Sequence, residues 1–218
     1  METNQLPLQP LLKKTAFLEL KRLIMDGTFP PGSFLSERRL AQRLNMSKTP
    51  IKSALDRLEA DGFIVTSPQQ GIVVRQLTVR EIKEHYDIRI ALETFVVRQI
   101  AGSLQSEQIE AIQRNLVEQQ HYLENKNTTG HVQADSDFHL FLAGVLDNQA
   151  ITQVMQHQRD KIMQVAVQIS NQNPSRMPMS RAEHLGIASA ILSGDGDLAA
   201  SRMAEHLAFG KRYLLSGE

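Results

Sequence analysis

Along the first 75 residues, the spacing of apolar positions changes from a helical period to a strand-like one. Apolar residues first recur at intervals of three and four, which predicts three helices, over 11–26, 37–44 and 48–60. Ser36 and Ser47 precede the second and third helices as N-cap residues. After these helices, the β-branched runs 63–66 and 72–74 flank a turn-rich link that contains Pro68 and Gly71, which predicts a β-hairpin.

From residue 76 onward the apolar residues keep helical spacing, and no segment alternates with period two. Thr78 with Glu81, and Ser180 with Glu183, have the spacing of capping boxes, so helices are expected to begin there. The segment 128–130 reads as a break between helices, and Asp197 as the cap of the last helix. The pattern predicts an all-α bundle of six helices, over 78–102, 106–125, 131–146, 149–171, 180–193 and 197–215.

Composition narrows the class of protein. The chain is 41% apolar and 22% charged, which is enough to bury a core, and it has no cysteine. Disulfides, thiolate metal sites and cysteine nucleophiles are therefore excluded. No apolar run approaches the length of a membrane span, and residues 1–10 lack the apolar core of a signal peptide. We expect a cytoplasmic protein.

The net charge of zero conceals an asymmetry between two parts of the chain. Residues 1–75 hold 11 Lys and Arg against 7 Asp and Glu, whereas residues 76–218 hold 13 against 17. This division predicts a basic domain over 1–75 and an acidic domain over 76–218. A basic domain suits contact with a polyanion, although chance clustering of surface charge would give the same numbers.

Three helices with a short turn before the third, followed by a hairpin, are typical of a winged helix-turn-helix. In such a domain the third helix enters the major groove of DNA. Its exposed side is expected to carry Ser47, Lys48, Thr49 and Lys52, which can donate to phosphates and base edges. Gly71 allows close backbone approach at the hairpin tip. The alternative for the lysines is a solvated helix face.

Four segments of this domain resemble the DNA-binding domain of the GntR family of bacterial transcription regulators: LSERRLA at 35–41, MSKTPIKSAL at 46–55, LEADGFI at 58–64 and QGIVV at 70–74. The resemblance implies that Arg38, Lys48, Thr49 and Lys52 contact DNA. It also implies that Ser47 caps the helix at a phosphate and that Gly71 lies at the wing tip. Lysines stand at 48 and 52 where the family usually has arginine, which can hold guanine with two bonds.

The second domain carries residues suited to a metal ion. Asp135 and His139 are four positions apart on one helix face, and His184 and His206 lie on two other predicted helices. One carboxylate and three imidazoles suit Zn²⁺, Ni²⁺, Mn²⁺ or Fe²⁺. From spacing alone, surface or structural histidines are the more common explanation of such a pattern.

Further segments resemble the FCD effector domain of the FadR subfamily: RIALE at 89–93, DSDFH at 135–139, HLGIASAI at 184–191 and GDLAASRMAEHL at 196–207. The resemblance implies a divalent metal, with Zn, Ni or Mn favoured, held by Asp135, His139, His184 and His206. The count of six helices is similar to the VanR branch. Asp137 lies on another helix face, and the remaining histidines at 85, 121, 131 and 157 are interpreted as structural or solvated.

Arg89 lies among apolar positions, so its charge needs a partner. One interpretation is a clamp for the carboxylate of an effector, and the other is a structural pair with an acidic residue such as Glu93.

The leading hypothesis is a ligand-responsive transcription regulator that is not an enzyme. It would bind a near-palindromic double-stranded DNA operator as a homodimer and sense a small organic acid at the metal. Two alternatives are a metal-ion sensor and a metal-dependent hydrolase with an attached DNA-binding domain. The hydrolase alternative lacks a recognisable general base.

Overall fold

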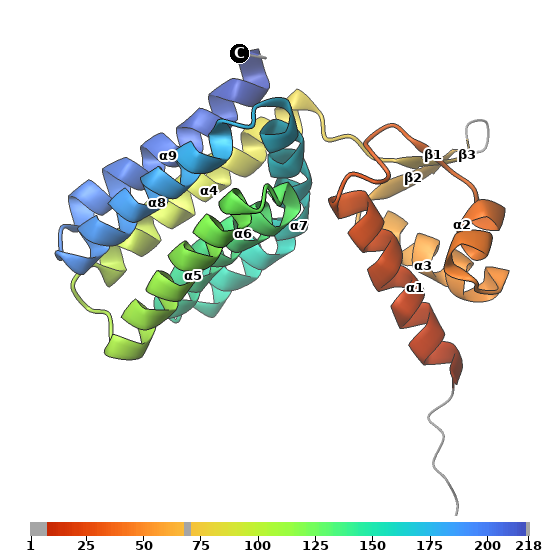
Figure 1. The fold of residues 1–218 in the computed structure, drawn as a ribbon, viewed down its shortest axis with the longest axis horizontal. Coiled ribbons are helices and arrows are strands. Elements are labelled where there is room, and N and C mark those ends of the chain that lie inside the picture. Colours follow the sequence, from red (N-terminus) through yellow and green to blue (C-terminus); the bar gives the residue numbers. More distant parts are fainter. Residues whose placement is uncertain (1–7, 68–70, 217–218) are drawn as a thin grey trace, which may run out of the picture. The chain divides into compact units, whose positions relative to one another are not determined.

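The chain divides into two compact units, residues 1–76 and 77–218. The structure, a computed structural model, describes residues 8–67 and 71–216 (Figure 1). The described residues are mainly α-helical with one small antiparallel sheet, which confirms the predicted fold class. None of the described helices combines the length and the apolar run that crossing a bilayer requires.

Over residues 8–67 and 71–76, the first unit contains three helices and a three-stranded sheet in the order β1-β3-β2. The elements are α1 Leu8–Met25, β1 Phe34–Leu35, α2 Glu37–Leu44, α3 Lys48–Ala60, β2 Ile64–Ser67 and β3 Gly71–Val74. Strands β2 and β3 form the predicted hairpin, with Ile64 opposite Val74. The sequence did not predict β1, because two residues are too few to show a period; it pairs through Phe34 with Val73.

The apolar stripe of α3 is buried against α1, so its polar side is turned outward. Ile51, Ala54, Leu55 and Leu58 are buried on α3, and Ala16, Phe17, Leu20, Leu23 and Ile24 on α1. The turn before α3 depends on Asn45, which adopts a left-handed conformation (φ 50°) while Met46 N–H donates to Ala41 O. Ser36 and Ser47 occupy the N-cap positions, but neither side chain makes a capping hydrogen bond.

The second unit is a bundle of six helices in its described part, as predicted. They are α4 Val79–Ile100, α5 Ser106–Glu124, α6 Thr128–Val145, α7 Gln149–Gln172, α8 Arg176–Leu192 and α9 Gly196–Ser216. Helices α4 and α9 lie side by side along much of their length (Figure 1). The capping box at the start of α4 is present, because Glu81 N–H donates to Thr78 Oγ1 and Thr78 N–H donates to Glu81 Oε2.

Three predicted helix boundaries in this unit are wrong. Residues 128–130 form the first turn of α6 rather than a break, because the Asn127 side chain caps that turn at Gly130 N–H. Helix α8 begins at Arg176, so Ser180 and Glu183 lie within it and do not form a capping box. Asp195 rather than Asp197 accepts the Leu198 N–H at the start of α9.

Apolar residues from all six described helices form the core of the second unit. Fully buried members include Val97 of α4, Ile112 of α5, Phe138 and Leu142 of α6, Ile187 and Ile191 of α8, and Met203 and Leu207 of α9. Several ionisable side chains are buried beside them, among them Glu93, His139, His184 and His206. A charged or polar group at such a depth needs a partner.

Candidate metal centre and nucleic-acid interface

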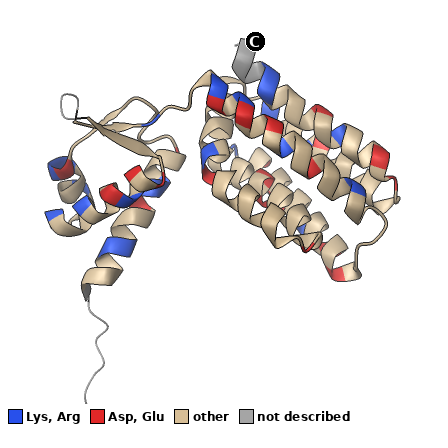
Figure 2. Ribbon diagram, turned by 180° about the vertical axis from the view of Figure 1, so that it is seen from behind, with Lys and Arg blue, Asp and Glu red and all other residues tan. Residues whose placement is uncertain are grey.

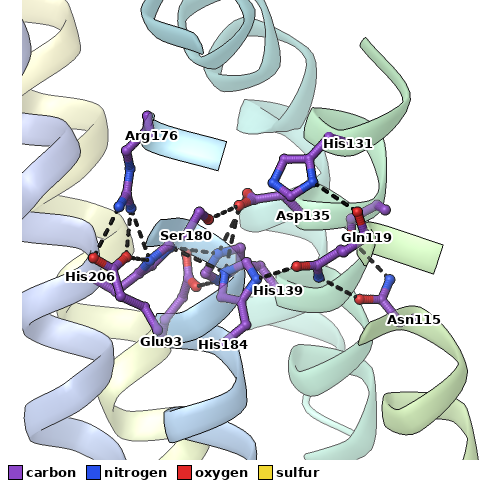
Figure 3. A network of polar contacts seen from close by, with 12 residues as sticks. Glu93, Asn115, Gln119, His131, Asp135, His139, Arg176, Ser180, His184 and His206 are labelled. Carbon is purple, nitrogen blue, oxygen red and sulfur yellow. Dashed lines mark hydrogen bonds and ion pairs between the residues drawn. The ribbon is translucent and has the colours of Figure 1, made fainter. Parts of the chain in front are cut away.

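The structure brings the four predicted metal ligands together inside the second unit. Asp135 and His139 come from α6, His184 from α8 and His206 from α9, and one ligand atom from each lies within 4.8 Å of the others. His206 Nε2 is 3.1 Å from His139 Nε2 and 3.4 Å from His184 Nε2. The Asp135 carboxylate lies 3.5 Å from His184 Nε2 and 3.8 Å from His139 Nε2. Three helices thus contribute to one buried cluster (Figure 3).

In each imidazole of the cluster, Nε2 faces the other ligands and Nδ1 lies close to an oxygen atom of a neighbouring side chain. His139 Nδ1 is 2.5 Å from Glu93 Oε2 and His206 Nδ1 is 2.6 Å from Glu183 Oε2. His184 Nδ1 is 2.9 Å from Gln119 Oε1. A carboxylate or amide oxygen only accepts a hydrogen bond, so Nδ1 of His184 and of His206 donates, and their Nε2 atoms direct lone pairs into the cluster. His139 Nδ1 contacts the Glu93 carboxylate as an ion pair, which favours the same tautomer. This is the arrangement by which second partners orient metal-binding histidines.

The amide of Gln119 is itself fixed. Its Nε2 donates to Asn115 Oδ1 at 2.7 Å, and Asn115 Nδ2 donates to the Ala134 carbonyl oxygen at 2.9 Å. Because the nitrogen is used in this way, the Gln119 oxygen must face His184 (Figure 3). The chain of amides therefore determines the tautomer of His184.

These residues fit a divalent cation. Three Nε2 lone pairs and a carboxylate repel one another in a buried space unless a proton or a metal ion lies between them. Burial lowers the pKa of His184 and of His206, the latter despite the hydrogen bond to Glu183, so both imidazoles favour the neutral form that binds metal. Burial opposes the ionisation of Asp135, but positive charge in the cluster, carried by the imidazoles of His184, His139 and His206 when they are protonated, lowers its pKa.

Arginines neutralise the two outer carboxylates. Arg89 Nε donates to Glu93 Oε1 at 2.6 Å, and Arg176 holds Glu183 with two hydrogen bonds of 2.9 and 2.7 Å. Burial would raise the pKa of Glu93, but Arg89 and His139 hold it at about 2. The pKa of Glu183 is likewise about 2, because hydrogen bonds from His206 and Arg176 overcome its partial burial. Arg89 therefore has the structural partner that one interpretation of the sequence required.

A cavity opens beside the cluster and has both a polar and an apolar lining. Its empty volume, mouth included, is about 920 Å³. The polar lining includes the charged and imidazole side chains of Arg89, Glu93, His131, Asp135, His139, Arg159, Arg176 and His206, together with Gln158, Ser170 and Ser180. The apolar lining comes chiefly from α6 and α7 and includes Val132, Leu140, Val154, Met155, Ile162 and Met163. Arg89 thus faces this space as well as pairing with Glu93.

The predicted DNA-contacting residues are exposed on the first unit. Arg38 lies on α2, Ser47 is the N-cap of α3, and Lys48, Thr49 and Lys52 occupy the first turns of α3. Gly71 begins β3 with φ 73°, next to the hairpin tip at 68–70, which lies outside the described residues. Lys and Arg occur on all three helices of this unit (Figure 2). The apolar side of α3 is therefore buried, whereas its basic side is exposed.

Comparison with known proteins matches both units to family models. Residues 12–74 match the model of the bacterial regulatory proteins of the gntR family, and residues 84–209 match the FCD domain. The chain is a GntR-family transcriptional regulator with an FCD domain. Both matches agree with the resemblances inferred from the sequence.

Relatives of this GntR-family regulator share both of its units. The HTH-type transcriptional repressor RspR of Escherichia coli strain K12 is 28% identical over 207 residues, which cover 95% of this chain and 90% of RspR. A solved GntR transcriptional regulator from Rhodococcus sp. RHA1 has a TM-score of 0.82 at 22% identity, covering 94% of this chain and 98% of that one. E. coli McbR/YncC has a TM-score of 0.78 at 20% identity, with the same coverage. RspR and the gntR family model describe transcriptional regulators, which agrees with the expectation that this chain is not an enzyme.

Sequence reasoning missed the residues that hold the histidines. Glu93 was considered only as a partner of Arg89, and Glu183 only as part of a capping box. Ser180, assigned to the same box, instead donates to Asp135 Oδ1 at 2.7 Å. Gln119 and Arg176 gave no signal, because their partners are 65 and 7 to 30 positions away in the chain. Asp137, set aside as a ligand, lies outside the cluster and pairs with Arg159.

Proposed function

We propose that this GntR-family regulator holds a divalent metal ion in its FCD domain and responds there to a small organic acid. Asp135, His139, His184 and His206 would bind the ion, with Zn²⁺, Ni²⁺ or Mn²⁺ the best match to nitrogen and carboxylate ligands. The observation that carries the proposal is the convergence of three imidazoles and the Asp135 carboxylate within 4.8 Å, with an oxygen close to Nδ1 of each imidazole.

The charges around the cavity favour a monoanionic effector. Arg89 pairs with Glu93, Arg176 with Glu183, and Arg159 with Asp137, so these six charges cancel. Asp135 remains, and a divalent ion bound by neutral imidazoles would leave one positive charge. A single carboxylate coordinated to the ion would neutralise it. Arg89 and Arg176 line the same space and could donate further hydrogen bonds to that carboxylate.

The first unit would read the operator. We assign Lys48, Thr49 and Lys52 to the major groove, Arg38 and Ser47 to phosphates, and Gly71 to the wing. The exposed position of the five side chains and the basic charge of their helices support this assignment. Because helix-turn-helix proteins usually read two-fold sites as dimers, we propose a homodimer on a near-palindromic operator.

The test measures DNA affinity of the full chain with and without an acid. An operator is first selected from random duplexes, and binding is then followed by fluorescence anisotropy with the zinc-loaded protein and a panel of organic acids. We expect at least one acid to weaken DNA binding in the wild type and to have no effect in His139→Ala. If no acid changes DNA binding, effector sensing at the metal is wrong.

Metal sensing remains a second candidate because the cluster itself is complete within the chain. In that case the ion would be the signal, and a chelator alone would change DNA affinity without any acid. A hydrolase is not favoured, since the matched proteins are regulators and both nearby glutamates are already paired.

A further inference from the structure

His131 has a buried nitrogen without a partner at the edge of the cavity. It lies in the first turns of α6, is 2% exposed and lines the cavity. Its Nδ1 is 3.3 Å from the Gln119 carbonyl oxygen, whereas Nε2 is buried with no hydrogen-bond partner among the residues that the structure describes. A buried polar atom of this kind is uncommon in folded proteins and points to a missing partner.

The contact at Nδ1 determines whether Nε2 of His131 donates or accepts a hydrogen bond. A carbonyl oxygen only accepts, so Nδ1 carries the proton and Nε2 of the neutral ring is an acceptor. Burial lowers the pKa of His131, which keeps the ring neutral. The missing partner is therefore a donor such as a hydroxyl group, and not a second carboxylate.

His131 is tied to the metal centre but is not part of it. It precedes Asp135 by one helical turn, which separates their Cβ atoms by roughly 5–6 Å. Gln119 contacts both sites, because its backbone oxygen meets His131 and its side-chain oxygen meets His184 (Figure 3). A ligand bound at the ion would thus have His131 within reach of its next few atoms.

We propose that His131 determines effector specificity by accepting a hydrogen bond from a hydroxyl group of the effector. The inference rests on the proposed function and names its effector class: a monocarboxylate that carries a hydroxyl beyond the second carbon and an apolar remainder. A hydroxyl on the second carbon would chelate the metal together with the carboxylate and would not need His131. The apolar remainder would contact the side chains of α6 and α7, including Leu140, Met155 and Ile162.

The experiment compares acids of one carbon skeleton on the zinc-loaded full chain by isothermal titration calorimetry. The probes are hexanoate, 2-hydroxyhexanoate, 3-hydroxyhexanoate, 5-hydroxyhexanoate and adipate. We expect the 3- or the 5-hydroxy acid to bind about tenfold more tightly than hexanoate, the size expected when one buried acceptor gains a donor. Adipate, with a second carboxylate facing a lone pair, should bind more weakly than hexanoate.

Two variants assign that preference to His131. In His131→Leu the advantage of the 3- or 5-hydroxy acid should fall to less than twofold, while hexanoate still binds. In His131→Gln the side-chain oxygen can accept, so part of the advantage should return. His157→Leu, at an exposed position on α7, is the matched control and should keep the full preference. Thermal unfolding of each variant verifies that it is folded.

The outcomes separate this inference from the function on which it rests. If hexanoate and its hydroxy derivatives all fail to bind, both proposals are wrong for this cavity. If hexanoate binds but the hydroxyl brings no gain, or the gain survives in His131→Leu, the role of His131 is refuted and acid sensing stands. A preference for adipate would also refute it, because the second polar end of the effector would then be a carboxylate, held by an arginine of the lining such as Arg159, and not a hydroxyl at His131.

Discussion

The two units of this GntR-family regulator place their functional residues in opposite environments. In the first unit Arg38, Lys48 and Lys52 are exposed, and the core beneath them is apolar. In the second unit the candidate metal ligands belong to the core: His184 is fully buried and stacks on Phe138 with ring centroids 4.4 Å apart. Substitutions in the first site should therefore change binding alone, whereas substitutions in the second should change binding and stability together.

Removal of the metal should have the largest effect. A ligand present at 100 to 1,000 times its dissociation constant adds about 3–4 kcal/mol to stability. Chelation should therefore lower the Tm of the second unit by roughly 10 °C, since 1 kcal/mol corresponds to about 2–4 °C in a chain of this size. Calorimetry before and after chelation measures this, and restored zinc should reverse the change. An unchanged Tm would mean that the cluster holds no ion.

The second largest effect is expected for the residues that contact Nδ1 of the histidines. Glu93→Gln keeps the shape of the side chain but weakens its hold on His139 Nδ1, so metal affinity should fall about 10- to 100-fold. Competition with a zinc indicator measures the change. Glu110→Gln on the exposed face of α5 serves as the control, because its carboxylate pairs only with the exposed Arg114. Equal metal affinity in both variants would show that Glu93 does not contribute to metal binding.

The exposed site should show a smaller effect confined to DNA binding. Lys48→Ala and Lys52→Ala should each weaken operator binding by about 1 kcal/mol. Each should also reduce the slope of affinity against salt by about one unit, because one phosphate is no longer neutralised. Their Tm should remain that of the wild type, because neither side chain is buried. Lys83→Ala, at an exposed position on α4, is the control. A lowered Tm in Lys48→Ala would break the contrast between the units.

The smallest expected effect is a loss of folding stability at low pH. The pKa of Glu183 is about 2 in the folded protein against an ordinary 4.5, so its ion pairs stabilise the fold above pH 4.5 and are lost as pH falls from 4.5 towards 2. Partial exposure of the side chain limits this contribution to about 1 kcal/mol. In the metal-free protein, Glu183→Gln should lose less stability over this range than the wild type in urea unfolding. Parallel curves would show that Glu183 is not held ionised.

Local patterns predicted helices and pairs within one helix better than they predicted the environment of the metal site. The period of three and four along α3, the capping box at Thr78 and the i, i+4 pair of Asp135 and His139 are short-range features that a sequence displays directly. The partners of the histidines depend on which helices meet, which no local period encodes. Ser180 illustrates the limit: its spacing to Glu183 is that of a cap, but the helix begins earlier because Arg176 anchors it through Glu183 and reaches His206.

A zinc titration of the full chain tests the central claim most directly, because the cluster is the feature that distinguishes the second unit from an ordinary helical bundle. The metal-free protein is titrated by calorimetry at neutral pH, beside His184→Ala and the exposed-site control His157→Ala. We expect one ion per chain for the wild type and for His157→Ala, with affinity lost in His184→Ala. Absence of zinc, nickel and manganese binding by the folded wild type would contradict the claim.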